Sequence, residues 1–495
     1  MLRRIRTFLA AIVFLLITLL FLDFTGTLHT YLGWMAKVQF LPAVLALNVV
    51  IVALLVLLTF VFGRIYCSVI CPLGIMQDLL ARLNRKKNRY AYSPARNTLR
   101  IVVFVVFVAV LIAGFGSLAA LLAPYSSFGR IAQNLLQPIY LALNNLLAMA
   151  AEHIGSYAFY EKEIWIRSLP TFVIAAISFA VIAFLAVRGG RTYCNTLCPV
   201  GTVLGYISRF SIFKVVIDEE KCRNCRKCER NCKASCIDIK NHTVDYSRCV
   251  ACGNCEKQCL FDAIKYKSSL ASAQVVNKES DKPSDSADAG RRNFLIGAGL
   301  AVTSVTLAQE KKKVDGGLAI IEDKVVPERT TPLTPPGSLS ARNMQQHCTA
   351  CQLCVSECPN DVLRPSTDLD KLMQPTMSYE KGFCRPECNR CSSVCPTGAI
   401  APITLADKSS IQIGHAVWIK KNCIAVEQEM DCGNCARHCP VGAIQMIHPD
   451  KDELQPMIPA IDESRCIGCG ACEYVCPARP FSAIYVEGHE VHKVN

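Results

Sequence analysis

The chain has 495 residues, of which 52% are hydrophobic and 29 are cysteines, and its formal net charge is +13. So many cysteines exclude an ordinary soluble domain without cofactors, and the positive mean hydropathy points to membrane segments. The excess of Lys and Arg lies beside apolar segments, which is typical of membrane topology and argues against nucleic acid as a partner.

Four apolar segments predict a four-helix transmembrane bundle within residues 1–214. They cover residues 8–22, 44–62, 101–123 and 172–187. Most approach the roughly 17–25 residues that span a bilayer. A soluble protein with buried core helices is the alternative, but such helices rarely reach this length without a charged residue. The segments contain no histidine, which argues against a haem b held by two histidines in the bundle.

Positive charge predicts the orientation of these helices. Arginine occurs at three of the first six positions, "RLNRKKNRYAYSPARNTLR" follows the second helix, and Arg188 and Arg191 follow the fourth. Lys and Arg gather on the cytoplasmic side, so the loops at 25–40 and 124–170 are expected outside. The second of these loops contains "NLLQPIYLALNNLLAMAAEHIG", which predicts either a helix on the outer membrane surface or a lid packed on the bundle.

The second and fourth helices are each followed by the same motif, "YCSVICPLG" and "YCNTLCPVG". The two cysteines of each motif are four residues apart, so Cys67 and Cys71, like Cys194 and Cys198, share one face if the motif is helical. The four thiols could hold an additional metal centre, form a redox-active dithiol, or belong to a structural turn repeated by internal duplication.

Two cysteine runs with the spacing C-x2-C-x2-C-x3-C follow, and this spacing is typical of iron–sulfur ligands. Their members are Cys222, Cys225, Cys228 and Cys232, and Cys249, Cys252, Cys255 and Cys259. The fourth cysteine of a run usually ligates the neighbouring cluster, so we expect Cys259 to complete the first cluster and Cys232 the second. Zinc sites usually pair C-x2-C hooks or include histidine, and disulfide scaffolds belong to small secreted domains, so both are disfavoured.

Residues 215–269 therefore resemble a bacterial two-cluster ferredoxin with an α+β fold. Cys236 is left over from both runs. Lys233 and Leu260 stand where a proline commonly follows the fourth cysteine, so Cys236 could take the place of Cys232.

The chain then becomes polar and rich in small residues over 270–290, which predicts a linker. Next comes "RRNFLIGAGLAVTSV", starting at Arg291, which is similar to a twin-arginine export signal and is expected to form a fifth membrane crossing at 291–309. The alternative is a chance arginine pair before a short amphipathic helix in a wholly cytoplasmic protein. A second linker, rich in Pro and Thr, is expected at 310–340.

Residues 341–495 carry four more cysteine runs, each of which ends in Cys-Pro. Their members are Cys348, Cys351, Cys354 and Cys358; Cys384, Cys388, Cys391 and Cys395; Cys423, Cys432, Cys435 and Cys439; and Cys466, Cys469, Cys472 and Cys476. The first step is widened in the second and third of these runs. The stretches "CPTGAIAPI", "CPVGAIQMI" and "CPARPFSAIYV" are typical of a strand after the run. We expect a four-cluster α+β ferredoxin-like domain here, and six [4Fe–4S] clusters in the chain.

The regular spacing of the first and last of these runs suggests that they pair and enclose the two irregular runs. Such nesting makes Cys476 complete the cluster of Cys348, Cys351 and Cys354, and makes Cys358 complete that of Cys466, Cys469 and Cys472. In the same way Cys439 would complete the cluster of Cys384, Cys388 and Cys391, and Cys395 that of Cys423, Cys432 and Cys435.

The first half of the chain, with its helices, paired "YC-x3-CP-x-G" motifs and two-cluster ferredoxin, resembles the membrane subunit of the quinol dehydrogenase that serves periplasmic nitrate reductase. The second half, with its twin-arginine signal and four cysteine runs, resembles the periplasmic ferredoxin subunit of that system and the related methylamine-utilisation ferredoxin. A fusion of two such subunits would leave the second export signal inside the chain.

The resemblance implies electron transfer from the membrane quinol pool, as (mena)quinol, to a periplasmic cytochrome or reductase. It places the protein in the bacterial inner membrane, with the N-terminus and first ferredoxin domain cytoplasmic and the C-terminal domain periplasmic. The sequence shows no haem c, P-loop or complete dinucleotide motif. Two other functions stay open: an assembly or maturation factor that reduces a metal or thiol in a partner enzyme, and electron input from a cytoplasmic ferredoxin.

Overall fold

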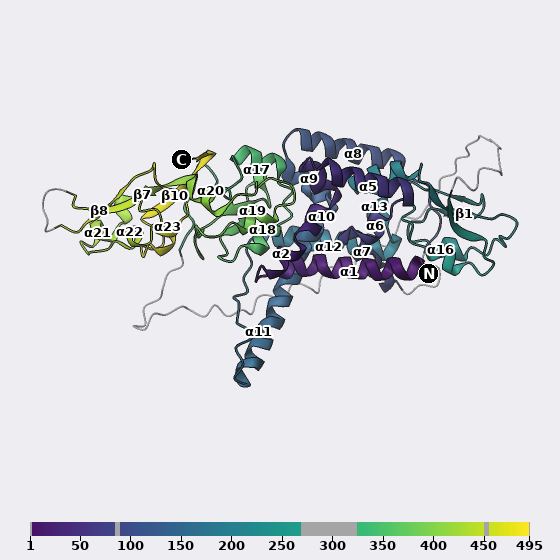
Figure 1. Ribbon diagram of the computed structural model, residues 1–495, viewed down its shortest axis with the longest axis horizontal. Coiled ribbons are helices and arrows are strands. Elements are labelled where there is room, and N and C mark those ends of the chain that lie inside the picture. The colour runs from purple at the N-terminus through teal and green to yellow at the C-terminus, as the bar shows by residue number, and fades with distance from the viewer. Residues whose placement is uncertain (1, 85–89, 269–323, 450–454, 495) are drawn as a thin grey trace, which may run out of the picture.

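The computed structural model describes residues 2–84, 90–268, 324–449 and 455–494. They form an elongated molecule, with a helical bundle in the middle and a domain containing strands at either end (Figure 1). The expected linker at 270–290, the twin-arginine-like segment at 291–309 and the first part of the linker at 310–340 lie outside the described residues.

The four apolar segments each supply a helix of the bundle. These helices are α1 (Leu2–Leu22), α5 (Val49–Phe62), α8 (Asn97–Ile112) and α12 (Leu169–Gly189). By length and composition, two described helices could cross a membrane: α1, over Arg3–Leu22, and α12, with mean hydropathies of 2.6 and 2.5. The helices α5 and α8 are apolar but shorter than the sequence predicts.

The third expected segment, 101–123, does not form one continuous helix. After α8 ends, Gly114 adopts a left-handed φ of 84°, and α9 (Gly116–Leu122) begins two residues later. The Phe115 amide donates to the Val110 carbonyl at 3.1 Å, the bond that closes a glycine C-cap. Local capping therefore interrupts an apolar run that hydropathy alone treats as a single span.

The second expected segment, 44–62, is also shortened at its start. Asn48 caps α5 by accepting a hydrogen bond from the Ile51 amide at 3.2 Å, and Val44 and Leu45 belong to the separate helix α4 (Phe40–Leu45). The 14 residues of α5 correspond to about 21 Å, less than the roughly 30 Å of a hydrocarbon core.

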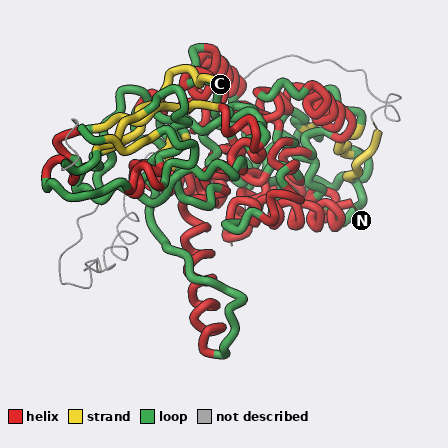
Figure 2. Tube along the Cα trace, turned by 60° about the vertical axis from the view of Figure 1, so that its left-hand side comes forward, coloured by secondary structure: helices red, strands yellow, loops and turns green. Residues whose placement is uncertain are grey.

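Further helices, most of them short, connect these four and surround the two repeated motifs. They are α2 (Thr27–Leu32), α3 (Trp34–Lys37), α6 (Tyr66–Val69), α7 (Pro72–Leu80), η1 (Ala81–Leu83), α10 (Pro124–Ile131), the π-helical turn η2 (Ala132–Leu136), α11 (Gln137–His153), α13 (Thr192–Thr196) and α14 (Pro199–Ser208). Figures 1 and 2 show α11 extending sideways from the bundle, so it is not a lid packed along it.

The first ferredoxin domain has the expected α+β character. Its elements are β1 (Phe213–Ile217), α15 (Lys227–Arg230), β2 (Ile237–Asp238), β3 (Thr243–Val244), α16 (Asn254–Gln258) and β4 (Ile264–Ser268). The first and last strands pair antiparallel, with Val215 opposite Tyr266, and β2 pairs antiparallel with β3. The closing of β1 on β4 brings the two cysteine runs between them into one small core.

The C-terminal domain consists of short helices and three two-stranded antiparallel sheets among its described residues. Its helices are α17 (Ala341–His347), α18 (Leu353–Glu357), η4 (Leu369–Lys371), α19 (Arg390–Val394), α20 (Leu405–Ser410), η5 (Lys420–Asn422), α21 (Ile424–Glu427), α22 (Asn434–Arg437) and α23 (Ala471–Val475). Its strands are β5 (Leu363–Pro365), β6 (Pro375–Met377), β7 (Ile411–Trp418), β8 (Ile444–Ile447), β9 (Ile458–Ile461) and β10 (Ile484–Val494).

Two expectations for this domain need correction. The stretch after Cys395 forms no strand, whereas those after Cys439 and Cys476 form β8 and β10. Residues 324–340, expected as part of a linker, pack on the domain: Leu333 is buried, and Arg329 pairs with the buried Glu473 at 2.6 Å. The Pro and Thr content of residues 324–340 is typical of a linker, but apolar and charged contacts with β10 and α23 hold this segment on the domain.

The two ferredoxin domains are docked at opposite ends of the bundle (Figure 1). At one end the Arg191 amide donates to the Lys233 carbonyl at 2.8 Å, and Arg64 donates to the Ser247 carbonyl at 3.0 Å. At the other end Arg167 pairs with Asp361 at 2.8 Å. The bundle therefore separates the cysteine runs of the first domain from those of the second.

Candidate iron–sulfur centres

In the first ferredoxin domain the cysteines line two cavities. One is lined by Cys222, Cys225, Cys228 and Cys259, and the other by Cys232, Cys249, Cys252 and Cys255. These are the two groups that exchange of the fourth cysteine predicts. Helices α15 and α16 lie side by side and carry the third cysteine of each run, so each fourth cysteine faces the neighbouring cavity.

Cys236 lies in the same cavity as Cys232. The two sulfur atoms are 3.5 Å apart, and Cys236 is buried. Its thiol also lowers the pKa of Cys249, the first cysteine of the second run, so these two side chains lie close together as well. The residue is thus placed where it could replace Cys232 as a ligand, which keeps that alternative open.

The four regularly spaced runs share one backbone conformation. The second and fourth residues after the first cysteine have left-handed φ angles between 46° and 77°: Asn224 and Arg226, Ala251 and Gly253, Ala350 and Gln352, and Gly468 and Gly470. For residues other than glycine this conformation costs about 1 kcal/mol or more. Repeated strain at the same positions indicates a functional constraint, because it folds three thiols of one loop toward a common point.

In the C-terminal domain, three cavities are each lined by four cysteines. They contain Cys358, Cys384, Cys388 and Cys391; Cys423, Cys432, Cys435 and Cys476; and Cys439, Cys466, Cys469 and Cys472. Each cavity combines three cysteines of one run with the fourth cysteine of another, as in the first domain.

The remaining four cysteines form a further group. Burial raises the pKa of Cys348, Cys351 and Cys354, and the charge of Cys395 raises each of them further. Cys395 therefore lies close to these three thiols, although it belongs to the next run. Thiols this buried are reluctant to ionise alone, so a positively charged metal core fits the group.

The nested arrangement of the four runs is wrong. Cys358 and Cys395 are exchanged between the first and second runs, and Cys439 and Cys476 between the third and fourth. The reason is helix packing, since α18 packs on α19 and α22 packs on α23. The domain is thus two consecutive two-cluster units, each with one regular and one widened run.

The two repeated motifs of the bundle bring their four cysteines together. Cys67 lies in α6 and Cys194 in α13, whereas Cys71 and Cys198 immediately precede the prolines that start α7 and α14. All four are buried, and their sulfur atoms lie within reach of one another's charges. Neither motif is a single helix, so the thiols meet through packing of the motifs and not along one helix face.

The cysteine groups are too wide for a single metal ion. A tetrahedral zinc site with Zn–S bonds of about 2.3 Å places its sulfur atoms about 3.8 Å apart. Among the described residues, one group of potential ligands has three donor atoms within 4.8 Å of one another, and it contains no cysteine. In an iron–sulfur cubane each thiolate binds a different iron, so wider groups of four thiols suit that cofactor.

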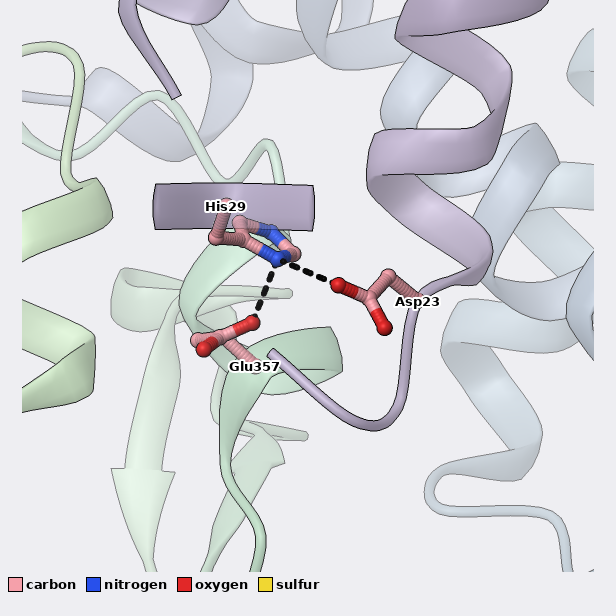
Figure 3. Close-up of side chains that lie close together, drawn as sticks. All are labelled: Asp23, His29 and Glu357. Carbon is pink, nitrogen blue, oxygen red and sulfur yellow. Dashed lines mark ion pairs between the residues drawn. The ribbon is translucent and has the colours of Figure 1, made fainter. Parts of the chain in front are cut away.

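The group that does meet this distance is Asp23, His29 and Glu357, residues that no motif in the sequence marks (Figure 3). His29 Nδ1 lies 2.5 Å from Glu357 Oε2 and 3.5 Å from Asp23 Oδ2. Asp23 already accepts hydrogen bonds from Thr25, Gly26 and Leu28. We interpret the group as a buried ionic contact that joins α2 to α18 of the C-terminal domain; no sequence motif links residues so far apart.

Comparison with known families supports iron–sulfur binding in four segments of the chain. A 4Fe-4S binding domain matches residues 44–90 and 171–217, and 4Fe-4S dicluster domains match residues 245–362 and 430–479. The match over 245–362 joins the run at Cys249 to that at Cys348, which the structure places at opposite ends of the bundle. That match therefore reflects the repeated spacing and not one domain.

Curated relatives give the family. The methylamine utilization ferredoxin-type protein MauM of Methylobacillus flagellatus is 32% identical over 168 residues, which are 32% of this chain and 70% of the relative. The chain belongs to the MauM family of ferredoxin-type proteins. MauM of Paracoccus denitrificans is 30% identical over 169 residues and 73% of its length, and the ferredoxin-type protein NapF of Escherichia coli is 28% identical over 158 residues and 87% of its length. This member of the MauM family is an iron–sulfur electron-transfer protein with several [4Fe–4S] clusters.

Proposed function

We propose that this protein carries electrons from the membrane quinol pool to a cytochrome or reductase that meets its C-terminal domain. The observation that supports this proposal best is the placement of ferredoxin domains at both ends of an apolar bundle. The 24 cysteines of the six runs are the proposed ligands of six [4Fe–4S] clusters. When bound, such clusters take up and release single electrons.

The surface of the bundle supports a place in the membrane. On α12 the exposed residues Val173, Ile177 and Val181 form a stripe at helical spacing, and Val49 and Val50 of α5 are 75% and 76% exposed. A soluble monomer rarely leaves so much contiguous apolar surface in water, whereas lipid chains cover it readily. We propose the bacterial inner membrane.

The distribution of charge and loops supports the orientation. The basic N-terminus lies beside the first ferredoxin domain (Figure 1), and the loops expected outside contact the C-terminal domain: Arg167 pairs with Asp361, and Lys381 pairs with Glu163. Under the positive-inside rule the first domain is then cytoplasmic and the C-terminal domain periplasmic. In this orientation α11 extends along the outer membrane surface.

The chain must pass from one end of the bundle to the other between Ser268 and Lys324. This requirement supports the use of residues 291–309 as the fifth crossing, with the twin-arginine pair of a fused second subunit at its cytoplasmic end. Four crossings return the chain to the side on which it started, so a domain at the opposite end needs one more.

Anaerobic reduction of the purified full-length protein by a menaquinol analogue in liposomes tests the proposal. Oxidation of quinol to quinone releases an electron pair and protons, so the iron–sulfur absorbance should bleach and EPR signals of reduced clusters should appear. Dithionite serves as the positive control. Clusters that respond to dithionite but not to quinol would exclude quinol as the donor.

Electron input from a soluble cytoplasmic carrier is the second candidate, and one observation favours it. Cys225 is exposed, and the exposed residues Arg223, Arg226 and Lys227 surround it. A basic surface beside an accessible cluster attracts an acidic carrier and speeds its association at low ionic strength. If this route operates, Arg223→Glu with Arg226→Glu should slow reduction by an acidic ferredoxin and leave reduction by quinol unchanged.

A further inference from the structure

The two motifs of the bundle are related by internal symmetry in space as well as in sequence. "GRIYCSVICPLG" begins at Gly63 and "GRTYCNTLCPVG" begins at Gly190, so Gly, Arg, Tyr, both cysteines, Pro and the last Gly recur in register. In both, the second cysteine precedes a proline that starts a helix, and that helix packs in the core of the bundle. The two motifs therefore place the same residue types on two sides of the space between them.

The arginine of each motif crosses to the other motif. Arg191 Nη1 donates to the Cys67 carbonyl at 2.7 Å, and Arg64 Nη2 donates to the Cys194 carbonyl at 3.1 Å. Each guanidinium also lies 3.8 Å from a cysteine sulfur, Arg64 from Cys67 and Arg191 from Cys194. The two cations thus flank the four thiols and tie the motifs together.

The glycine that ends each motif makes room for this exchange. A Cβ at Gly74 would lie 2.6 Å from Arg191 Nη1 and would overlap the Cys67 carbonyl. A Cβ at Gly201 would lie 2.9 Å from Arg64 Nη2 and would overlap the Cys194 carbonyl. The motif therefore needs glycine because the opposite arginine and the cysteine loop approach its backbone.

The buried charges around the thiols do not balance. Both guanidinium groups are fully buried. Arg191 pairs with Asp78 at 2.8 Å, but Asp78 also faces Lys233 and Arg6, and Arg64 has no carboxylate within salt-bridge distance among the described residues. Buried charges are paired or bind metals. The four cysteines of the motifs, together with Cys249 of the first ferredoxin domain near Arg64, are the groups here that can carry the balancing negative charge.

We propose that Cys67, Cys71, Cys194 and Cys198 hold a seventh [4Fe–4S] cluster, shared by the two motifs, with Arg64 and Arg191 as its counter-charges. Four thiolates around an oxidised cubane core leave a net charge of about −2, which two guanidinium groups balance. The matched family describes 4Fe-4S binding, yet each matched segment contributes only one pair of these cysteines, so the cluster must bridge them. This inference goes beyond the proposed function and does not depend on the electron donor.

The surroundings also set the redox character of this cluster. Gln77 Nε2 donates to Cys194 Sγ at 3.2 Å, and the Gly201 amide donates to Cys198 Sγ at 3.3 Å. Hydrogen bonds to the sulfur atoms and nearby positive charge stabilise the reduced state, which carries more negative charge. The shared cluster should therefore have a more positive potential than it would without the arginines.

Iron analysis of the full-length protein, purified anaerobically, tests the assignment. The wild type should contain about 28 iron and 28 sulfide per chain, and Cys67→Ser with Cys194→Ser should reduce each by about 4 while the EPR signals of the ferredoxin clusters persist. Equal iron content in the two proteins would overturn the proposal. Loss of one zinc per chain, or a new disulfide reducible without loss of iron, would overturn it in favour of a zinc site or a dithiol.

Redox titration tests the role of the arginines. Arg64→Gln should keep the iron of the wild type and shift one cluster component to more negative potential, and Arg64→Lys should shift it less. Arg100→Gln is the matched control, because Arg100 is buried and donates to Ser247 as Arg64 does, but within the described part of the chain it donates to no cysteine sulfur. Equal shifts in Arg64→Gln and Arg100→Gln, or none in either, would contradict the counter-charge role. Arg64→Gln could fail to assemble its clusters. In that case, an Arg64→Lys variant with full iron content and an unchanged cluster potential would contradict the counter-charge role as well.

Discussion

Asp78 is nearly fully buried in α7 and lies between three cations. Arg191 Nε is 2.8 Å, Lys233 Nζ 3.3 Å and Arg6 Nη1 3.8 Å from its carboxylate oxygens. Burial alone would raise the pKa of Asp78, but Arg191, Lys233 and Arg6 lower it to about 2. Because Lys233 belongs to the first ferredoxin domain, this one carboxylate joins that domain to the bundle.

Asp78→Asn should strongly destabilise the protein. The variant removes the carboxylate that Arg191 and Lys233 share, and breaking a buried ion pair by removing one partner typically costs about 3–5 kcal/mol. The folded pKa lies below the unfolded value of 3.8, so the stabilisation by Asp78 is present above that pH and is lost as the pH falls toward about 2. Thermal unfolding of the detergent-solubilised protein measures the effect, with Asp78→Glu as the control that keeps the charge. An unchanged unfolding temperature in Asp78→Asn would contradict this account.

His29 plays a similar part at the opposite end of the bundle. Burial lowers the pKa of His29, but its contacts with Asp23 and Glu357 outweigh burial and raise it above 6.5. Arg390 also faces Glu357, at 3.7 Å, and limits how strongly that carboxylate attracts the imidazole. The protonated His29 thus binds two carboxylates, one of them on the C-terminal domain.

Docking of the C-terminal domain should weaken as the pH rises. The pKa of His29 is higher in the folded protein than in the unfolded chain. Its contribution to the stability of the docked domain is therefore complete below about pH 6.5 and is lost as the pH rises through the raised pKa. Hydrogen exchange of α2 and α18 should therefore be slower at pH 6 than at pH 9 after correction for intrinsic rates. His29→Asn should remove that difference; if the difference persists in the variant, another group is responsible.

At the scale of elements, the unit of organisation is a pair of adjacent helices, each carrying the third cysteine of its run. The pair α15 and α16 occurs in the first ferredoxin domain, and α18 with α19 and α22 with α23 repeat it in the C-terminal domain. The fourth cysteine of each run follows the helix and lies toward the cavity of the neighbouring run. Exchange between adjacent runs follows because short connections keep these helices side by side.

Paired substitutions distinguish adjacent exchange from nesting. Cys354 and Cys395 share one cluster in the structure, so Cys354→Ser with Cys395→Ser should lose about 4 iron atoms per chain. Cys354→Ser with Cys476→Ser should lose about 8, since Cys476 lines a different cavity. Iron analysis after anaerobic purification gives both values. Losses in the opposite order would restore the nested arrangement.

At the scale of the whole molecule, two ferredoxin domains and a bundle with an apolar surface form one row (Figure 1). If the bundle spans the membrane, the row crosses it, and the four buried thiols of the bundle lie between the two domains. The two domains then lie on opposite sides of the membrane, so the chain that joins them must cross the membrane once more.

Reporter fusions test that consequence. A reporter after Asn495 should behave as periplasmic, and one inserted at about residue 284 should behave as cytoplasmic. Arg291→Lys with Arg292→Lys should impair export of the C-terminal domain, because it removes the arginine pair of the proposed signal. Cytoplasmic behaviour of both reporters would rule out a crossing between them.

Much of the local chemistry could be predicted from the sequence alone. Three cysteines separated by two residues each leave little freedom in how a loop can fold around a cubane, so the runs at Cys222 and Cys249 could be assigned. The structure groups the fourth cysteine of each run with the other run in one cavity, as the predicted exchange requires. The duplication of the Tyr-Cys motif was equally visible. The repeated arginine at positions 64 and 191 was visible too, but its meaning depends on contacts across the bundle.

What the sequence by itself determined is what short spacing dictates: the cysteine runs, the α+β ferredoxin units and the apolar helices. Only the tertiary structure decided which runs share a cavity, where the four bundle thiols meet, that 324–340 belongs to a domain, and that His29 faces Glu357. Hydropathy also missed the break at Gly114, where a single left-handed residue ends α8. The physical reason is range: spacing within one loop restricts nearby thiols directly, whereas ligands and ion pairs from distant segments are brought together by helix packing, which no local pattern encodes.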